Sequence, residues 1–247
     1  VEKPVASTVA EAEELGQVAD KHGVVSMVGH IERFNPVVLE MLRPEYRPIL
    51  HINIQRIGSF TARILDNVVD DLMIHDLDIV LAFVDSPLQS VDGVGVAVLS
   101  DSEDIANARL KFENGCVANL TASRVSPDSM RKIRVFSGGE TTSYVSLDYR
   151  RQEGFIYRIA RDGEEESSLW KKLLRAKDTA IVSEFGGKRI VREPVPIEKG
   201  DPLLQELRHF AQCVREQQTP KVSGESAKQA LDVALEITRQ IQELETK

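Results

Sequence analysis

The chain has 247 residues, 42% of them hydrophobic, which is enough for the cores of one or two globular domains. Its formal net charge of -8 argues against a nucleic-acid partner, because binding to phosphates depends on Lys and Arg gathered on one face. No apolar run approaches the length of a membrane span and no secretory signal opens the sequence, so we expect a cytoplasmic protein without a membrane partner.

The first 29 residues predict a helix followed by a short strand. Thr8 and Glu11 have the spacing of a capping box, and apolar residues at helical spacing continue to Gly23. The run 24–28 is apolar except for Ser26, which is typical of a strand buried on both faces of a parallel sheet. The sequence holds no partner strands for such a sheet, so we expect residues 1–29 to be poorly anchored.

A polar segment, 29–36, follows this run directly. Asn35 is suited to cap a new helix and Pro36 to its first turn. Open α/β sheets bind ligands beyond the ends of their strands, so polar side chains such as His30 and Arg33 are placed where a ligand would lie. A helix cap at Asn35 and a surface charge at Arg33 are the simpler alternative.

The most informative stretch is a helix expected over 70–84. Asp71, His75 and Asp78 share one narrow stripe of it, because positions three and four apart lie on the same face. Most other positions are apolar, which indicates a helix buried on most sides. A carboxylate and an imidazole there form either a structural ion pair or an acid-base pair in which Asp71 orients His75. We expect no metal site, because the adjacent His75 and Asp76 would point about 100° apart.

Alternation predicts strands before and after this helix. From residue 49 onward Leu50, Ile52 and Ile54 are expected on one face of a half-buried strand. Further runs separated by short turns lie at 90–99, 105–112, 116–124, 131–137, 143–149, 153–160 and 188–195. The fold class is therefore α+β, with a large, mostly antiparallel sheet that carries helices on one face.

The other face of this sheet is expected to be open and in parts apolar. The residues that indicate this are Val94, Val96, Val98, Ala118 and Leu120. Such a face favours a homodimer or homotetramer packed sheet to sheet.

A charged segment, 161–180, is expected to be a mobile loop, and two helices close the chain. The first begins at Asp201 and Pro202, the second at Ser223, and both carry apolar residues at helical spacing. We expect both to be packing elements, and the stripe of the first consists of Leu203, Leu207, Phe210 and Val214.

The motifs Glu2-Lys3-Pro4, 29–36 and Asp71-x-x-x-His75 together resemble, in order and spacing, the glucose-fructose oxidoreductase / inositol dehydrogenase (Gfo/Idh/MocA) family. The resemblance covers nearly the whole chain. It implies that residues 1–29 are the C-terminal remnant of an NAD(P)-binding Rossmann domain and residues 30–247 the family's C-terminal substrate and oligomerisation domain. Met73 departs from the family, which often has Gly there, and the glycine-rich cofactor loop is absent.

The resemblance also implies the site, an NAD or NADP cofactor, and a sugar or sugar-nucleotide substrate. The implied residues are Lys3, Asp71 and His75 for catalysis, His30, Arg33 and Asn35 for substrate binding, and Glu2, Lys3 and Pro4 for the cofactor. Within the family, the segments 29–36 and 71–78 look most like the enzymes that oxidise the 3-hydroxyl of UDP-N-acetylglucosamine.

The chemistry of such an oxidation explains these residue types. A neutral imidazole at His75 can take the hydroxyl proton, and Asp71 would hold its tautomer. The charge of Lys3 would stabilise the developing alkoxide. Without a glycine-rich loop to hold the pyrophosphate, we expect the chain by itself to be inactive.

Two other functions stay open. One is a non-catalytic sugar-binding or oligomerisation module derived from such an enzyme. The other is an isomerase or lyase with Lys3 as an amine nucleophile. NAD and NADP are not distinguished, because the residue that reads the ribose 2′ position lies in the glycine-loop part of such a domain.

Overall fold

The computed structural model describes residues 1–60, 67–138, 142–160 and 180–245. All but the last residue of the loop expected at 161–180 lies outside these ranges. The described strands form one nine-stranded sheet in the order β2-β3-β4-β1-β5-β6-β7-β9-β8. Their bounds are β1 (Ile49–Ile57), β2 (Leu88–Val96), β3 (Ile105–Phe112), β4 (Val117–Ser123), β5 (Met130–Ser137), β6 (Ser143–Asp148), β7 (Glu153–Ile159), β8 (Ala180–Phe185) and β9 (Lys188–Pro194).

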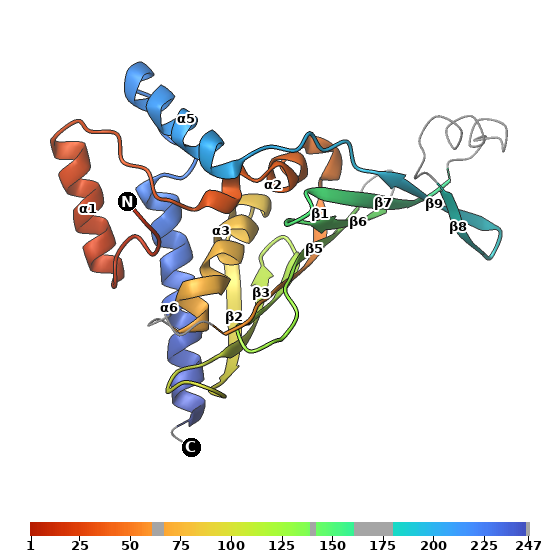
Figure 1. The fold of residues 1–247 in the computed structure, drawn as a ribbon, viewed down its shortest axis with the longest axis horizontal. Coiled ribbons are helices and arrows are strands. Elements are labelled where there is room, and N and C mark those ends of the chain that lie inside the picture. The colour runs from red at the N-terminus through yellow and green to blue at the C-terminus, as the bar shows by residue number, and fades with distance from the viewer. Residues whose placement is uncertain (61–66, 139–141, 161–179, 246–247) are drawn as a thin grey trace.

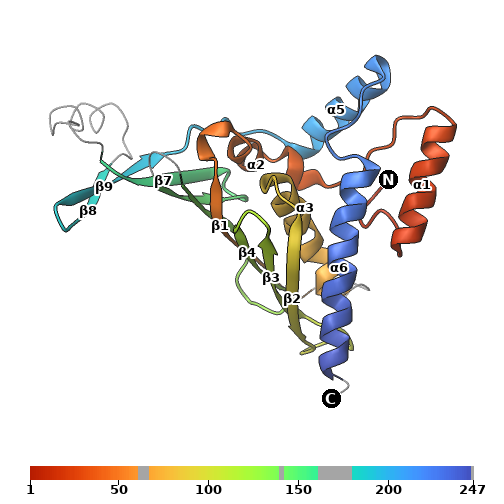
Figure 2. The same ribbon diagram turned by 180° about the vertical axis from the view of Figure 1, so that it is seen from behind.

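The sheet is antiparallel except where β1 pairs in parallel with β4, and its helices lie on one face (Figure 1, Figure 2). The predicted fold class is confirmed. The helical elements are α1 (Val9–Lys21), η1 (Ile31–Phe34), α2 (Pro36–Met41), η2 (Pro44–Tyr46), η3 (Val69–Met73), α3 (Ile74–Phe83), α5 (Pro202–Glu216) and α6 (Gly224–Glu245).

The core fills the space between the sheet and the helices α3 and α6. Its largest fully buried side chains include Phe83 of α3 and Ile52 and Ile54 of β1. Helix α6 lies very close to β2, because a Cβ atom built on Gly93 would come within 2.8 Å of Ile237 Cγ2. Gly93 therefore serves the contact between helix and sheet.

The expected open face is corrected at several positions. Ala118 and Leu120 are buried on the helix side, whereas Val94 and Val96 are more than half exposed. Pairing explains the difference: Val94 lies opposite Asn107, which lies opposite Thr121, so Leu120 points to the other face. The register also shifts between Ile49 and His51, and Leu50 is exposed instead of lying with the buried residues of β1.

The helix expected over 70–84 begins with a π-helical turn, η3, before the α-helix α3. The backbone N–H of Ile74 donates to the carbonyl of Val69, five residues earlier. The wider turn changes the angular spacing of side chains, so Asp71 and His75 lose the stacking of an uninterrupted α-helix.

The segment 1–29 differs from its prediction in two ways. The capping box of Thr8 and Glu11 is present, but the run 24–28 joins no strand among the described residues. The segment is nevertheless held, because Met27 and Val28 pack with Val222 and the N–H of Val28 donates to the Val222 carbonyl. Apolar packing against α6 thus anchors it where strand pairing does not.

The prediction that the apolar stripe of α5 packs against other elements is also wrong. Leu203, Leu207 and Val214 are between 42% and 56% exposed, and the packing predicted for them is absent within the described residues. Cys213 and Glu206 are the buried residues of this helix instead.

No helix of the described residues combines the length and the apolar character that crossing a membrane requires.

Candidate functional site

Lys3 lies against the π-helical turn that precedes α3. Its Nζ donates to the backbone carbonyl of Asp71 at 2.6 Å and lies 3.4 Å from the Asp71 carboxylate. It also reaches the carbonyl of Asp70 at 3.5 Å. Both side chains of the Lys3–Asp71 pair remain partly exposed, so the fold brings two distant motifs together at a surface open to a ligand.

His75 and His30 form the second part of the site. Their rings meet edge to face with centroids 6.0 Å apart, and His30 is 1% exposed. Within the described residues, neither ring nitrogen of His30 nor Nδ1 of His75 has a hydrogen-bond partner. Buried polar atoms are rarely left so, which marks the His30–His75 pair as unusual in this fold.

The electrostatics keep both imidazoles neutral. Burial, and then the charges of Arg33 and Lys3, lower the pKa of His30 to about 4. Burial lowers the pKa of His75 well below its ordinary value, and the charges of Arg56 and Lys3 act in the same direction. A neutral imidazole can accept a proton from a substrate hydroxyl.

The expected hydrogen bond between Asp71 and His75 is not found in the described part of the chain. The Asp71 carboxylate faces Lys3 instead. The π-helical turn between the two residues accounts for this, since it removes their stacking on one face. The structure pairs Lys3 with Asp71 and His30 with His75.

Arg33 and Asn35 are held by intramolecular bonds. Arg33 Nη1 lies 3.1 Å from the buried carboxylate of Asp78, where burial raises the pKa of Asp78 to about 7 against the opposing charge of Arg33. Asn35 Oδ1 accepts the backbone N–H of Val37 at the start of α2, and its amide donates to Glu32. The helix cap predicted as the simpler alternative for Asn35 is therefore present, and Arg33 ties η1 to α3.

Glu2 and Pro4 flank Lys3 at the same edge. The Glu2 carboxylate lies beside Gly29, because a Cβ atom there would come within 3.4 Å of Glu2 Oε2. The backbone N–H of Gly29 donates to the carbonyl of Val1. The Glu-Lys-Pro motif and the polar segment 29–36 are thus neighbours.

The interpretation of the sequence missed a buried charge network behind His75. Arg56 Nη2 and Nε bind both carboxylate oxygens of Asp76, at 2.7 and 2.9 Å, and its Nη1 binds Glu32 at 3.0 Å. All three residues are buried. The signal was available, since Arg56 has the same parity along β1 as Ile52 and Ile54 and so had to point into the core.

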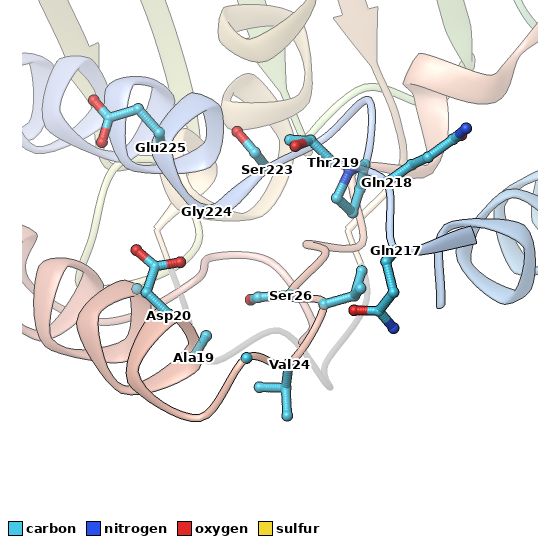
Figure 3. A pocket seen from close by; sticks show the side chains of 14 residues that line it. Ala19, Asp20, Val24, Ser26, Gln217, Gln218, Thr219, Ser223, Gly224 and Glu225 are labelled. Atoms are coloured by element: carbon cyan, nitrogen blue, oxygen red, sulfur yellow. The ribbon is translucent and has the colours of Figure 1, made fainter. Parts of the chain in front are cut away.

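The cavity of Figure 3 is a separate feature. It holds about 550 Å³ between the C-terminal end of α1 and the loop that leads into α6. Asp20, Ser26, Thr219 and Glu225 are among its lining residues, and none of the predicted site residues is.

Comparison with known proteins finds similarity to dehydrogenases. Residues 60–142 match the family described as the GFO/IDH/MocA C-terminal domain. The UDP-N-acetylglucosamine 3-dehydrogenase of Acidithiobacillus ferrooxidans is 29% identical over 96% of this chain and 69% of its own length. The NAD(+)-dependent scyllo-inositol 2-dehydrogenase of Bacillus subtilis is 25% identical over 96% of this chain and 66% of its own length.

Comparison of the fold with solved structures finds the same relative. A solved structure of the Acidithiobacillus ferrooxidans enzyme superimposes with a TM-score of 0.84 and 28% identity, over 100% of this chain and 72% of that one. The similarity thus extends from the Glu-Lys-Pro motif to the last helix.

Proposed function

We propose, from the premise that this chain carries the C-terminal domain of the Gfo/Idh/MocA family, that it is the substrate-binding part of an NAD(P)-dependent dehydrogenase acting on a sugar or sugar-nucleotide hydroxyl. The 3-hydroxyl of UDP-N-acetylglucosamine is the first candidate, because the relative with that activity matches almost the whole chain. The observation that carries the proposal is the neutral, half-buried His75 near Lys3 and His30, whose Nδ1 has no hydrogen-bond partner among the described residues.

Each residue of the group has its own part in the reaction. His75 accepts the proton of the reacting hydroxyl, and Lys3 stabilises the negative charge that develops on its oxygen. Asp71 holds the Lys3 ammonium in place rather than orienting the imidazole. Because Lys3 Nζ donates to carbonyl and carboxylate oxygens, its surroundings suit an ammonium group and do not favour an amine nucleophile.

We expect a dinucleotide to bind beside this group of residues. The partly exposed Lys3 offers a polar contact to a nicotinamide, and Glu2 and Pro4 flank it. When bound, the dinucleotide supplies the acceptor for the hydride that leaves the sugar carbon.

We assign residues 1–29 to the dinucleotide-binding domain and residues 30–247 to the substrate and oligomerisation domain. The run 24–28 supports this, because no strand of the described residues pairs with it. Leu15 and Val18 on the outer face of α1 are 46% and 49% exposed, as expected of a helix that another layer covers.

The test is an assay for reduced cofactor. A polypeptide that joins this chain to a dinucleotide-binding domain should form NADH or NADPH from UDP-N-acetylglucosamine, detected by fluorescence. The 247 residues alone should form neither, because they contain no glycine-rich loop for the pyrophosphate. A joined polypeptide that binds the sugar without reducing the cofactor would instead support a non-catalytic module.

The open face of the sheet is proposed to form a homodimer or homotetramer. Aromatic rings of His51, Phe136, Tyr144 and Tyr157 cross it on neighbouring strands, with centroids 4.8 to 5.7 Å apart, and Phe136 is 41% exposed. Phe136→Glu should therefore yield a monomer in light scattering at micromolar concentration, since a buried charge opposes packing of the two sheets. Leu244→Glu, on the helix side, should leave the oligomer intact. A wild-type monomer at these concentrations would contradict the proposal.

A further inference from the structure

A group of cations stands out on this acidic chain at the start of β5 and the end of β6. Arg131, Arg150 and Arg151 line one cleft of about 500 Å³, together with the single carboxylate of Asp148. One oxygen of Asp148 accepts the backbone N–H groups of Arg150 and Arg151, both at 3.0 Å. This carboxylate therefore fixes the turn that presents the two arginines and leaves the cleft positively charged.

Two of these guanidinium groups have donors to spare. Within the described residues, Arg131 makes one contact, at 3.4 Å to Glu32, and its side chain is 46% exposed. Arg150 makes one side-chain contact, at 3.5 Å to the carbonyl of Ser129, and is exposed. Since a guanidinium carries five N–H donors, both can bind further oxygens, and their planar shape suits phosphate.

A smaller cavity of about 210 Å³ shares Arg131 and Arg150 with this cleft. Tyr149 also lines it, is 3% exposed, and has no hydrogen-bond partner for its hydroxyl in the part of the chain that the structure describes. A buried hydroxyl without a partner indicates that a ligand atom belongs beside it. Glu32 and Asn35, on the segment that begins at His30, form another wall.

The cleft is connected to the proposed catalytic group. Arg131 lies directly opposite Arg56 across the pairing of β5 with β1, and both contact Glu32. Arg56 in turn holds Asp76, the neighbour of His75 in sequence. The charge of Arg131 also acts on His75, so the cleft and the imidazole lie within electrostatic reach of one another.

We propose that Arg131, Arg150 and Arg151 bind the diphosphate of a nucleoside-diphosphate sugar whose sugar ring lies at His75. The inference rests on the proposed function and names the substrate class that the site selects. The guanidinium groups would hold the two phosphates, and the Tyr149 hydroxyl would donate to an oxygen of the same ligand.

Calorimetric titration of the 247-residue chain with UDP tests the proposal without any cofactor. UDP should bind saturably and more weakly at higher salt, and Arg131→Gln and Arg150→Gln should each weaken it at least about 10-fold. Arg150 is exposed, so its replacement leaves the fold intact. Arg109→Gln is the matched control, because Arg109 is an exposed arginine of β3, three strands away in the sheet and on its open face.

Other outcomes are decisive as well. No saturable UDP binding, or binding unchanged in both variants, would overturn the proposal. So would ADP-ribose binding as tightly as UDP with the same dependence on the two arginines, since the cleft would then serve the dinucleotide. UDP binding without cofactor reduction in the joined polypeptide would contradict the proposed dehydrogenase and leave this site standing. Oxidation of a neutral sugar without UDP binding would support the proposed dehydrogenase and contradict the diphosphate site.

Discussion

Replacement of His75 by alanine should lower kcat of the proposed dehydrogenase at least about 10²-fold and leave cofactor affinity nearly unchanged. The reason is that this imidazole is a neutral base beside Lys3, and the other unpartnered imidazole of the described site, His30, is almost fully buried. The measurement compares initial rates of cofactor reduction with the dinucleotide Kd obtained separately. His22→Ala, at the exposed C-terminal end of α1, is the matched histidine control.

The pH profile gives a second measure of the same role. Burial and the nearby cations lower the pKa of His75 well below 6.5, so the base stays deprotonated as the pH falls through that value. We expect kcat/KM to remain level from pH 8 down through 6.5 and to decline only below it. Unchanged turnover in His75→Ala, or an acid limb centred near 6.5, would remove His75 from this role.

Local sequence signals predicted most of the secondary structure. The capping box at Thr8 and Glu11, the cap at Asn35 and the cap at Asp201 are all present, because each depends on residues within one helical turn. The strands likewise follow their alternation, since one face of the sheet is buried under helices and the other is not.

The predictions that are wrong concern what a helix or strand packs against. The faces of Ala118 and Leu120 are set by the pairing of β4 with β3, and the run 24–28 lacks the partners that would make it a strand. The stripe of α5 has the periodicity of a buried helix and yet stays exposed. Periodicity shows that a face is apolar, and it does not show which layer covers it.

The residues of the site likewise fall into those that sequence motifs predict and those that only the fold brings together. The motifs of the family predict that Lys3, Asp71 and His75 belong to one site, and the contact of Lys3 with Asp71 agrees with that grouping. Arg56 and Arg131 share no motif and no helical or strand periodicity, and only the antiparallel register of β1 and β5 sets them side by side. Sequence patterns report on neighbours along the chain, so a contact that depends on strand register escapes them.

The buried charge network makes Arg56 the residue whose loss should cost most stability. Arg56→Met would leave the carboxylates of Asp76 and Glu32 buried without their main counter-charge, and breaking a buried pair in this way costs about 3 to 5 kcal/mol. Urea unfolding followed by circular dichroism measures the loss. Arg134→Met is the matched control, because Arg134 lies on the same sheet and, among the described residues, its side chain binds only Gln55. We expect this change to alter stability by less than about 1 kcal/mol.

Combining the change with its partner separates a missing counter-charge from a simple packing defect. If the stranded charge of Asp76 causes the loss, Arg56→Met with Asp76→Asn should be more stable than the sum of the two single changes predicts, since an amide tolerates burial without a cation. Strict additivity would mean that the guanidinium contributes through packing alone. A positive coupling would identify Arg56 as the residue that holds the start of α3, and with it His75, against the sheet.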